Sequence, residues 1–113
     1  MKVTVTERSG VIVVTPTGEV NLQTLPEMRR LLLDHLARGC NLVVDLGDVS
    51  YIDSSGIASL VEGHQMARKG GKRFVLAHLG PAALRVLQPA RLDKVFTILS
   101  TVDEGVAELT PAK

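Results

Sequence analysis

Aromatic side chains are scarce in this sequence of 113 residues, which has no tryptophan, one tyrosine and two phenylalanines. The core must therefore be aliphatic, and the chain offers no stacking platform for single-stranded nucleic acid. The sequence also lacks an excess of charge of either sign, because the formal net charge is +1. No run of Lys and Arg exceeds two residues. We therefore expect no nucleic-acid partner.

Cysteine and long apolar runs are also nearly absent. Cys40 is the single cysteine, so an internal disulfide is excluded, and its neighbours Gly39 and Asn41 provide no metal-ligand spacing. No stretch approaches the roughly 18 apolar residues of a membrane span, and no apolar signal region follows Met1. We expect a cytoplasmic protein without a metal, a cofactor or a membrane span.

The composition that remains is that of an ordinary globular protein, with 45% hydrophobic and 22% charged residues. The length fits one core, so we treat 1–113 as a single domain. Apolar periodicity predicts the order β-β-α-β-α-β-α-β-α. We expect an α/β fold with a mixed sheet of four to five strands and about four helices. The first two strands form a hairpin, and the strand-helix-strand units imply parallel neighbours.

The expected boundaries depend on turn and capping residues. Pro16 and Gly18 are expected to end the second strand, and Thr24 is expected to cap the first helix. Gly70 ends the second helix, and a capping box begins the last helix at Thr101. The expected elements are strands at 3–6, 11–14, 42–46, 74–77 and 95–99 and helices at 25–38, 57–69, 81–88 and 102–109.

A polar segment separates an apolar run from the second helix and consists of Asp53, Ser54, Ser55 and Gly56. The apolar helical pattern is established by Ile57, so this segment lies in the first turn of the helix. There four backbone N–H groups lack partners, and the helix dipole has its positive end. We expect Asp53 or Ser54 to cap the helix, because Asp and Ser are preferred caps. One cap does not need three polar residues, so a further role stays open.

A catalytic serine and a phosphate cradle are two interpretations of this segment. The nucleophile elbow of hydrolases has glycines two residues before and after its serine, and neither serine here has both. The candidate bases His35, His64 and His78 show no supporting acid, and His64 lies on the apolar face of the helix. We therefore expect no enzyme. Asp53 would repel a phosphate and no P-loop lysine is present, although weak nucleotide binding at the helix start stays open.

Modification of Ser55 is the remaining interpretation. A phosphate there would lie beside free N–H groups and the positive end of the helix dipole, so the fold should survive. It would still add a charge of about −1.5 to −2 next to Asp53. A partner docking over this helix end would meet a like-charge clash of several kcal/mol. Such a clash corresponds to about a thousandfold loss of binding, because each tenfold step is about 1.4 kcal/mol.

Three stretches of the sequence resemble the STAS domains, in particular the bacterial anti-sigma factor antagonists. The family signature, an apolar strand followed by D-S-S-G and an apolar helix, resembles VVDLGDVSYIDSSGIASLVEG. The family's G-E-apolar-Asp turn with its helix resembles GEVNLQTLPEMRRLLLDHL, and its carboxyl-terminal stretch resembles LDKVFTILSTVDEGVAEL. The resemblance runs from about Val3 to Leu109 and implies a STAS-like fold.

The resemblance implies a partner switch, with no reaction catalysed by this chain. Members of the family are phosphorylated on the second serine of the pair, which here is Ser55. The kinase is the anti-sigma factor itself, which binds ATP and acts on serine. The unphosphorylated antagonist binds that factor and frees the sigma factor. The phosphorylated form lets go, and a metal-dependent serine phosphatase restores it.

One residue departs from the family pattern. Asn21 stands where the family has an aspartate near the modified serine, so the charge is lost while hydrogen bonding is kept. Either Asn21 simply serves a turn, or phosphorylation or kinase affinity is altered. The expected partner-binding residues are Asn21, Asp53, Ser54, Ser55, Gly56, Ala58 and Ser59. Ala58 and Ser59 are expected to face outward or sideways, because they lie off the apolar stripe of the helix.

The competing function within the family is a constitutive adaptor, either a subunit of a lipid-transport ABC ATPase or part of a signalling scaffold. Relatives of that kind often replace the serines, so the presence of Ser54 and Ser55 favours the switch. We expect a monomer or a weak dimer. The sequence does not identify the sigma factor or the triggering signal.

Overall fold

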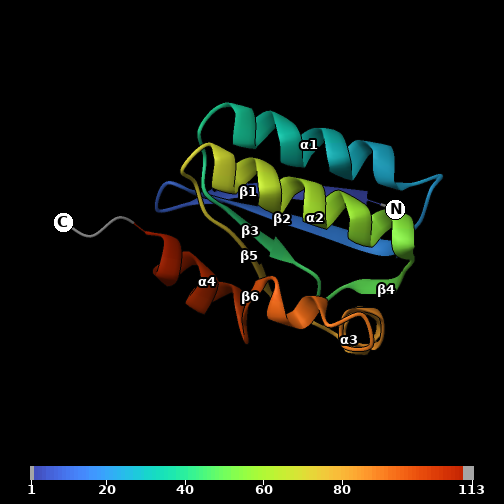
Figure 1. Ribbon diagram of the computed structural model, residues 1–113. Helices are drawn as coiled ribbons and strands as arrows, with labels where there is room; N and C mark the ends of the chain where they lie inside the picture. Colours follow the sequence, from blue (N-terminus) through green and yellow to red (C-terminus); the bar gives the residue numbers. More distant parts are fainter. Residues whose placement is uncertain (1, 111–113) are drawn as a thin grey trace.

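A six-stranded mixed sheet with helices on both faces forms the structure, a computed structural model that describes residues 2–110 (Figure 1). The strands are β1 (Lys2–Arg8), β2 (Val11–Val20), β3 (Leu42–Asp45), β4 (Val49–Ile52), β5 (Phe74–Ala77) and β6 (Thr97–Leu99). The helices are α1 (Leu25–Ala37), α2 (Ser54–Lys69), α3 (Pro81–Leu87) and α4 (Val102–Leu109), with a 3₁₀ turn at η1 (Leu92–Lys94). The predicted α/β class is confirmed.

The main path of the sheet has the strand order β1-β2-β3-β5-β6. β1 and β2 form the predicted antiparallel hairpin, and the other neighbours on this path are parallel. Helices α1 and α2 cover one face of the sheet and α4 covers the other, while α3 packs beside β4 (Figure 1).

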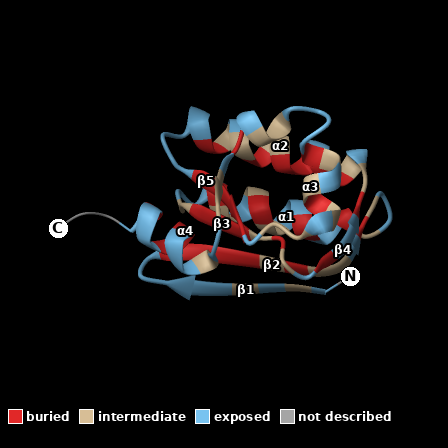
Figure 2. Cartoon of the chain, turned by 90° about the horizontal axis from the view of Figure 1, so that it is seen from below, coloured by how far each residue is buried: buried red, intermediate tan, exposed pale blue. Residues whose placement is uncertain are grey.

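Two largely aliphatic cores lie between the sheet and its helices, and the larger one also holds Phe74 and Phe96; Figure 2 shows buried residues in red. Ile12 and Val14 of β2 belong to the core that also contains the buried side chains of α1 and α2. Val11 and Val13 belong to the core under α4. Neighbouring residues of β2 enter different cores because side chains alternate along a strand.

Strand β4 is a sixth strand that the sequence pattern did not predict. Its two central residues, Ser50 and Tyr51, are exposed, so the segment shows no continuous apolar run. It pairs in parallel with the end of β2, where Val20 lies opposite Ile52. The element order is therefore β-β-α-β-β-α-β-α-β-α.

This pairing requires β2 to be longer than predicted. The prediction that Pro16 and Gly18 end the strand is wrong, because β2 continues to Val20. Pro16 lies between residues 12–14, which pair with β3, and residues 18–20, which pair with β4. A residue without a backbone N–H fits there because it interrupts neither parallel ladder.

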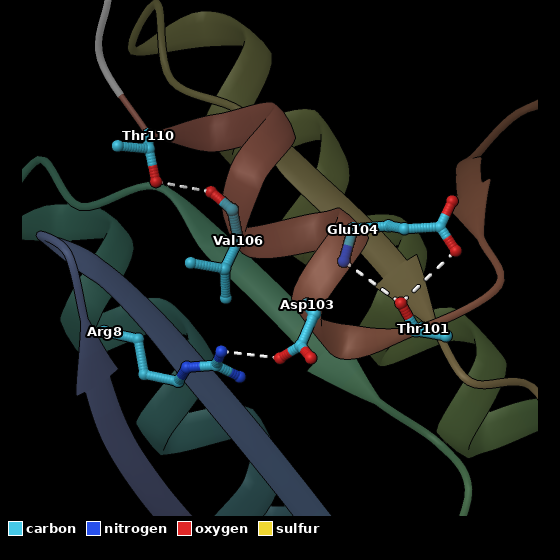
Figure 3. A network of polar contacts seen from close by, with 6 residues as sticks. All are labelled: Arg8, Thr101, Asp103, Glu104, Val106 and Thr110. Atoms are coloured by element: carbon cyan, nitrogen blue, oxygen red, sulfur yellow. Dashed lines mark hydrogen bonds and ion pairs between the residues drawn. The ribbon is translucent and has the colours of Figure 1, made fainter.

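The predicted helix ends are confirmed in part. At α4, Thr101 Oγ1 accepts a hydrogen bond from the N–H of Glu104 at 3.1 Å, which confirms Thr101 as the cap (Figure 3). The Glu104 carboxylate accepts from the Thr101 hydroxyl at 3.2 Å, whereas in a full capping box it would accept from the Thr101 backbone N–H. Arg8 at the end of β1 forms an ion pair with Asp103 in the first turn of the same helix. At α1, Thr24 occupies the N-cap position as predicted, but its side chain makes no capping bond to the helix. The last strand is shorter than predicted, because the chain before it turns through η1.

Helix α2 ends at Gly70 as predicted. Within residues 2–110, none of the helices is both long enough and apolar enough to cross a membrane.

Candidate functional site

The start of α2 lies beside the turn that follows β2. Parallel pairing of β2 with β4 places Val20 opposite Ile52, and the N–H of Asp53 donates to the Val20 carbonyl at 3.2 Å. The turn at residues 21–24 and the residues at 53–56, called the DSSG segment below, therefore lie at the same end of the sheet (Figure 1). The two segments form the candidate site.

Asp53 caps helix α2 with one carboxylate oxygen. Its Oδ1 accepts hydrogen bonds from the N–H of Ser55 at 3.0 Å and from the N–H of Gly56 at 3.1 Å. The same oxygen accepts the hydroxyl of Ser55 at 2.5 Å, a length in the range of charge-assisted O–H···O⁻ bonds. The prediction that Asp53 or Ser54 caps this helix is confirmed, and the cap is Asp53.

These hydrogen bonds also control the charge of the site. The hydroxyl of Ser55, followed by the N–H groups of Gly56, Ser55 and Leu22, holds the pKa of Asp53 below its ordinary value, against the opposing effect of partial burial. The carboxylate is therefore ionised at neutral pH. A full negative charge therefore lies directly beside the Ser55 oxygen.

The two serines have different surroundings. Ser55 is half-buried, and its hydroxyl is hydrogen-bonded to Asp53. Ser54 is exposed, and no hydrogen bond found within residues 2–110 joins its side chain to a carboxylate. The pair thus offers one oriented hydroxyl and one free hydroxyl.

Gly56 allows α2 to approach the paired strands closely. It is buried, and a Cβ atom there would lie 2.7 Å from Cγ1 of Ile52 and 2.9 Å from Cγ1 of Val20. These distances are shorter than carbon atoms tolerate, so a side chain would push the start of the helix away from β2 and β4. Gly56 therefore lets the start of α2 pack close to β2 and β4, and it presents little surface to a partner.

Ala58 and Ser59 differ in exposure, although both were expected to face outward or sideways. Ala58 is exposed. Ser59 is only 5% exposed, and its hydroxyl donates to the Ser55 carbonyl at 3.3 Å. The expectation for Ser59 is wrong because the buried stripe of α2 is broad enough to include it beside Gly56, Leu60 and Gly63.

Asn21 closes the turn after β2. Its Oδ1 accepts hydrogen bonds from the N–H groups of Gln23 at 3.0 Å and Thr24 at 3.2 Å. The hydroxyl of Thr24 in turn accepts from the N–H of Asn21 at 2.9 Å and donates to the carbonyl of Glu19 at 2.8 Å. Of the two alternatives for Asn21, this geometry favours the turn, because the side-chain oxygen already serves two backbone groups.

Two exposed apolar residues at this end of the sheet were missed by the sequence analysis. Leu22 follows Asn21 in the turn and is 73% exposed, and Tyr51 in β4 is 49% exposed. Large apolar side chains in solvent are a feature of protein-binding surfaces when they flank polar groups. The sequence signal that could have identified Leu22 was a single leucine in the polar stretch N-L-Q-T. The exposure of Tyr51 could be predicted only with knowledge of strand β4.

The histidines lie away from the DSSG segment. His64 is half-buried and packs edge-on against Phe74 and Phe96, with ring centroids 6.4 and 5.4 Å away. Burial, assisted by the charge of Arg68, lowers the pKa of His64. His35 Nδ1 lies 2.8 Å from the Leu31 carbonyl, and His78 Nδ1 lies 3.1 Å from Oδ1 of Asp45. Over residues 2–110, no histidine hydrogen-bonds to either serine of the segment.

The part of the chain that the structure describes holds no group of three or more His, Cys, Asp or Glu residues suited to binding a metal ion.

The fold and the site define a class of small α/β domains that present an oriented serine at a capped helix start. Over residues 2–105, the chain matches the family model described as the STAS domain. The chain belongs to the STAS domain family.

Similar proteins carry related names. The chain is 28% identical over 106 residues to the anti-sigma-B factor antagonist of Bacillus subtilis, a match that covers 94% of this chain and 97% of that protein. The crystal structure of an anti-sigma factor antagonist from Mycobacterium paratuberculosis has a TM-score of 0.88 and 27% identity, covering 97% of this chain and 94% of that one. An anti-sigma-factor antagonist (STAS) domain protein from Planctomyces limnophilus shares the fold, with a TM-score of 0.81 and 22% identity over 96% and 98% of the two chains.

Proposed function

We propose that this chain is an anti-sigma factor antagonist whose binding to its partner is switched off by phosphorylation of Ser55. In this proposal the partner is an anti-sigma factor with serine-kinase activity, and a metal-dependent serine phosphatase reverses the modification. The observation that carries the proposal is the hydrogen bond from the Ser55 hydroxyl to Asp53 at the start of α2. Family membership and the names of the similar proteins support it.

The unphosphorylated form would bind through the surface around the DSSG segment. That surface combines the exposed Ser54 and Ala58 with the exposed Leu22 from the neighbouring turn. An apolar side chain among small ones allows close approach and excludes water at the centre of an interface. Binding would occupy the anti-sigma factor and release its sigma factor, so the chain would control transcription in the cytoplasm without catalysing a reaction.

The phosphorylated form would lose this affinity through charge. A phosphate on Ser55 places about −1.5 to −2 charges next to the ionised carboxylate of Asp53. A partner surface that fits the unmodified serine would then have to accommodate both negative groups, at a cost of several kcal/mol. The expected loss of affinity is about a thousandfold. The fold should survive, because the N–H groups and the dipole at the start of α2 favour an anion.

Partner capture with two bait proteins tests this function. Ser55→Ala mimics the unmodified state and Ser55→Asp adds a negative charge at the switch position. Ser100→Asp is the matched control, because it adds the same charge just before the start of α4, on the other face of the sheet. Each bait is incubated with lysate of the source cells, and retained proteins are identified by mass spectrometry.

The switch predicts that an ATP-binding anti-sigma factor is retained by Ser55→Ala and Ser100→Asp and lost from Ser55→Asp. It also predicts that the captured factor, given Mg-ATP, adds phosphate to Ser55 of the wild-type chain. Retention of the same partners by both Ser55 baits would contradict the proposal. A transporter ATPase among those partners would favour a constitutive adaptor.

A further inference from the structure

The carboxylate of Asp53 accepts a hydrogen bond from the hydroxyl of Ser55, the group that the proposed phosphorylation would modify. Resting on that proposed function, we propose that Asp53 is a catalytic residue supplied by the substrate. It orients the Ser55 hydroxyl and accepts its proton during phosphoryl transfer. The antagonist then contributes part of the chemistry that switches it off.

The geometry around Oδ1 of Asp53 carries this inference. An ionised carboxylate only accepts hydrogen bonds, so the Ser55 hydroxyl is the donor in the 2.5 Å contact between Oγ and Oδ1. Two backbone N–H groups, those of Ser55 and Gly56, bind the same oxygen and keep it in place. With its proton directed at Asp53, the Ser55 oxygen has its lone pairs free for an approaching phosphorus atom.

The atoms balance in a single displacement. A lone pair of Ser55 Oγ forms a bond to the γ-phosphorus of ATP held by the partner kinase. The bond between that phosphorus and its bridging oxygen breaks, and the electron pair leaves with ADP. The hydroxyl proton passes to Oδ1 of Asp53, which later releases it to water.

A weak base is sufficient for this step. The hydrogen bonds that lower the pKa of Asp53 keep the carboxylate in its accepting form at neutral pH, although they make it less basic. The transition state of phosphoryl transfer is loose, so the hydroxyl loses its proton late, after bonding to phosphorus has made it acidic. Protein kinases use an aspartate of the enzyme in the same role.

Other groups near the site are not placed to do this. The Asn21 side chain is uncharged, and its oxygen is bound to the amides of the turn. His64 packs edge-on against the rings of Phe74 and Phe96. Among the residues that the structure describes, Ser54 has no carboxylate acceptor for its hydroxyl. The proposal therefore accounts for modification of the second serine of the pair instead of the first.

The test compares Asp53→Asn with the wild type in phosphorylation by the serine kinase that the Ser55→Ala bait captures. Asn is as good a helix cap as Asp, so the variant keeps the start of α2 while it loses the proton acceptor. We expect kcat to fall about 100-fold, the order of a general-base contribution. KM should stay within about twofold, because the docking surface is kept. The matched control is Asp48→Asn, which removes one negative charge from an exposed position and should keep the wild-type kcat.

The outcomes separate this inference from the function on which it rests. A wild-type chain that receives no phosphate on Ser55 would overturn the proposed function itself. Phosphorylation of the wild type together with a wild-type kcat in Asp53→Asn would overturn only the role of Asp53. A higher KM at unchanged kcat would overturn it too, because Asp53 would then serve docking alone. If circular dichroism shows that Asp53→Asn is unfolded, Asp53→Ser replaces it with the same expectations, since Ser also caps but cannot take the proton.

Discussion

The backbone N–H of Asp53 donates a hydrogen bond to the carbonyl of Val20 at 3.2 Å, and this contact joins the start of α2 to the end of β2. The turn beyond Val20 carries the exposed Leu22, and the first turn of α2 carries Ser55. A modifiable hydroxyl, a carboxylate and an apolar side chain therefore lie at one end of the sheet, although they come from two segments that are far apart in the chain.

Gly56→Ala is expected to destabilise the fold. The added Cβ would lie 2.7 Å from Ile52 and 2.9 Å from Val20, and such overpacking costs about 1–3 kcal/mol. The higher helix propensity of alanine offsets about 1 kcal/mol of this cost. Urea unfolding measures the difference. Gly70→Ala is the control, because a Cβ there would be 3.6 Å from its nearest neighbour, the Met66 carbonyl oxygen. Equal stability of the two variants would contradict the prediction.

Under the proposed function, Leu22→Ala is expected to weaken binding of the proposed anti-sigma factor partner by about 10-fold or more, as for an apolar anchor at the centre of an interface. Stability should stay within about 0.5 kcal/mol of the wild type, because the side chain is 73% exposed. Titration calorimetry with the purified partner measures the affinity. Val95→Ala truncates another exposed apolar residue, after η1, and serves as the control. Unchanged affinity of Leu22→Ala would place the interface elsewhere.

Two variants of Asn21 distinguish its turn role from a charge role. Asn21→Ala removes the acceptor for the N–H groups of Gln23 and Thr24, so we expect a loss of about 1–2 kcal/mol in unfolding free energy. Asn21→Asp keeps an acceptor oxygen and adds the charge typical of the family, so stability should change by less than about 0.5 kcal/mol. Urea unfolding compares both with the wild type. A large loss in Asn21→Asp with none in Asn21→Ala would show that the turn does not depend on this oxygen.

His64 is expected to make the fold less stable in mild acid. Burial, with the charge of Arg68, lowers its pKa in the folded state. The unfolded chain therefore binds a proton first as the pH falls. The stabilising contribution is complete above the unfolded pKa of about 6.5 and is lost as the pH falls through the folded value. His64→Gln does not titrate, so the wild type should lose more of its urea midpoint than the variant between pH 7.5 and pH 5. Parallel pH profiles would exclude this linkage.

Ser55→Ala is expected to raise the pKa of Asp53 towards its ordinary value, because the Ser55 hydroxyl is the largest cause of the lowering. Carbon-13 NMR of the Asp53 carboxyl group across an acid titration measures the change and needs no partner protein. Ser54→Ala is the control and should leave the titration of Asp53 unchanged. An identical Asp53 titration in Ser55→Ala and the wild type would show that the hydroxyl bond is not formed in solution.

Local features of this protein were predictable from neighbouring residues. The cap on α2, the Thr101 cap on α4 and the end of α2 at Gly70 join groups only a few positions apart, so residue types and spacing were sufficient. Thr24 is the N-cap residue of α1 as predicted, but its hydroxyl donates to the carbonyl of Glu19 and does not bond to the helix. Residue preferences alone did not predict this competing bond. The expectation for Ser59 failed because the width of the buried stripe on α2 depends on what packs against it.

The sequence by itself determined that an oriented polar segment begins a helix, because Asp, Ser and Gly at such a position have strong local preferences. Only the tertiary structure decided what lies next to that segment. The pairing of β2 with β4 places Val20 opposite Ile52, although α1 and β3 lie between them in the sequence. Strand β4 has only four residues, and its two central residues are exposed, so it gives no periodic signal of this pairing. Long-range packing decides which strands pair, so only the folded chain shows that the turn with Leu22 lies at the same end of the sheet as Ser55.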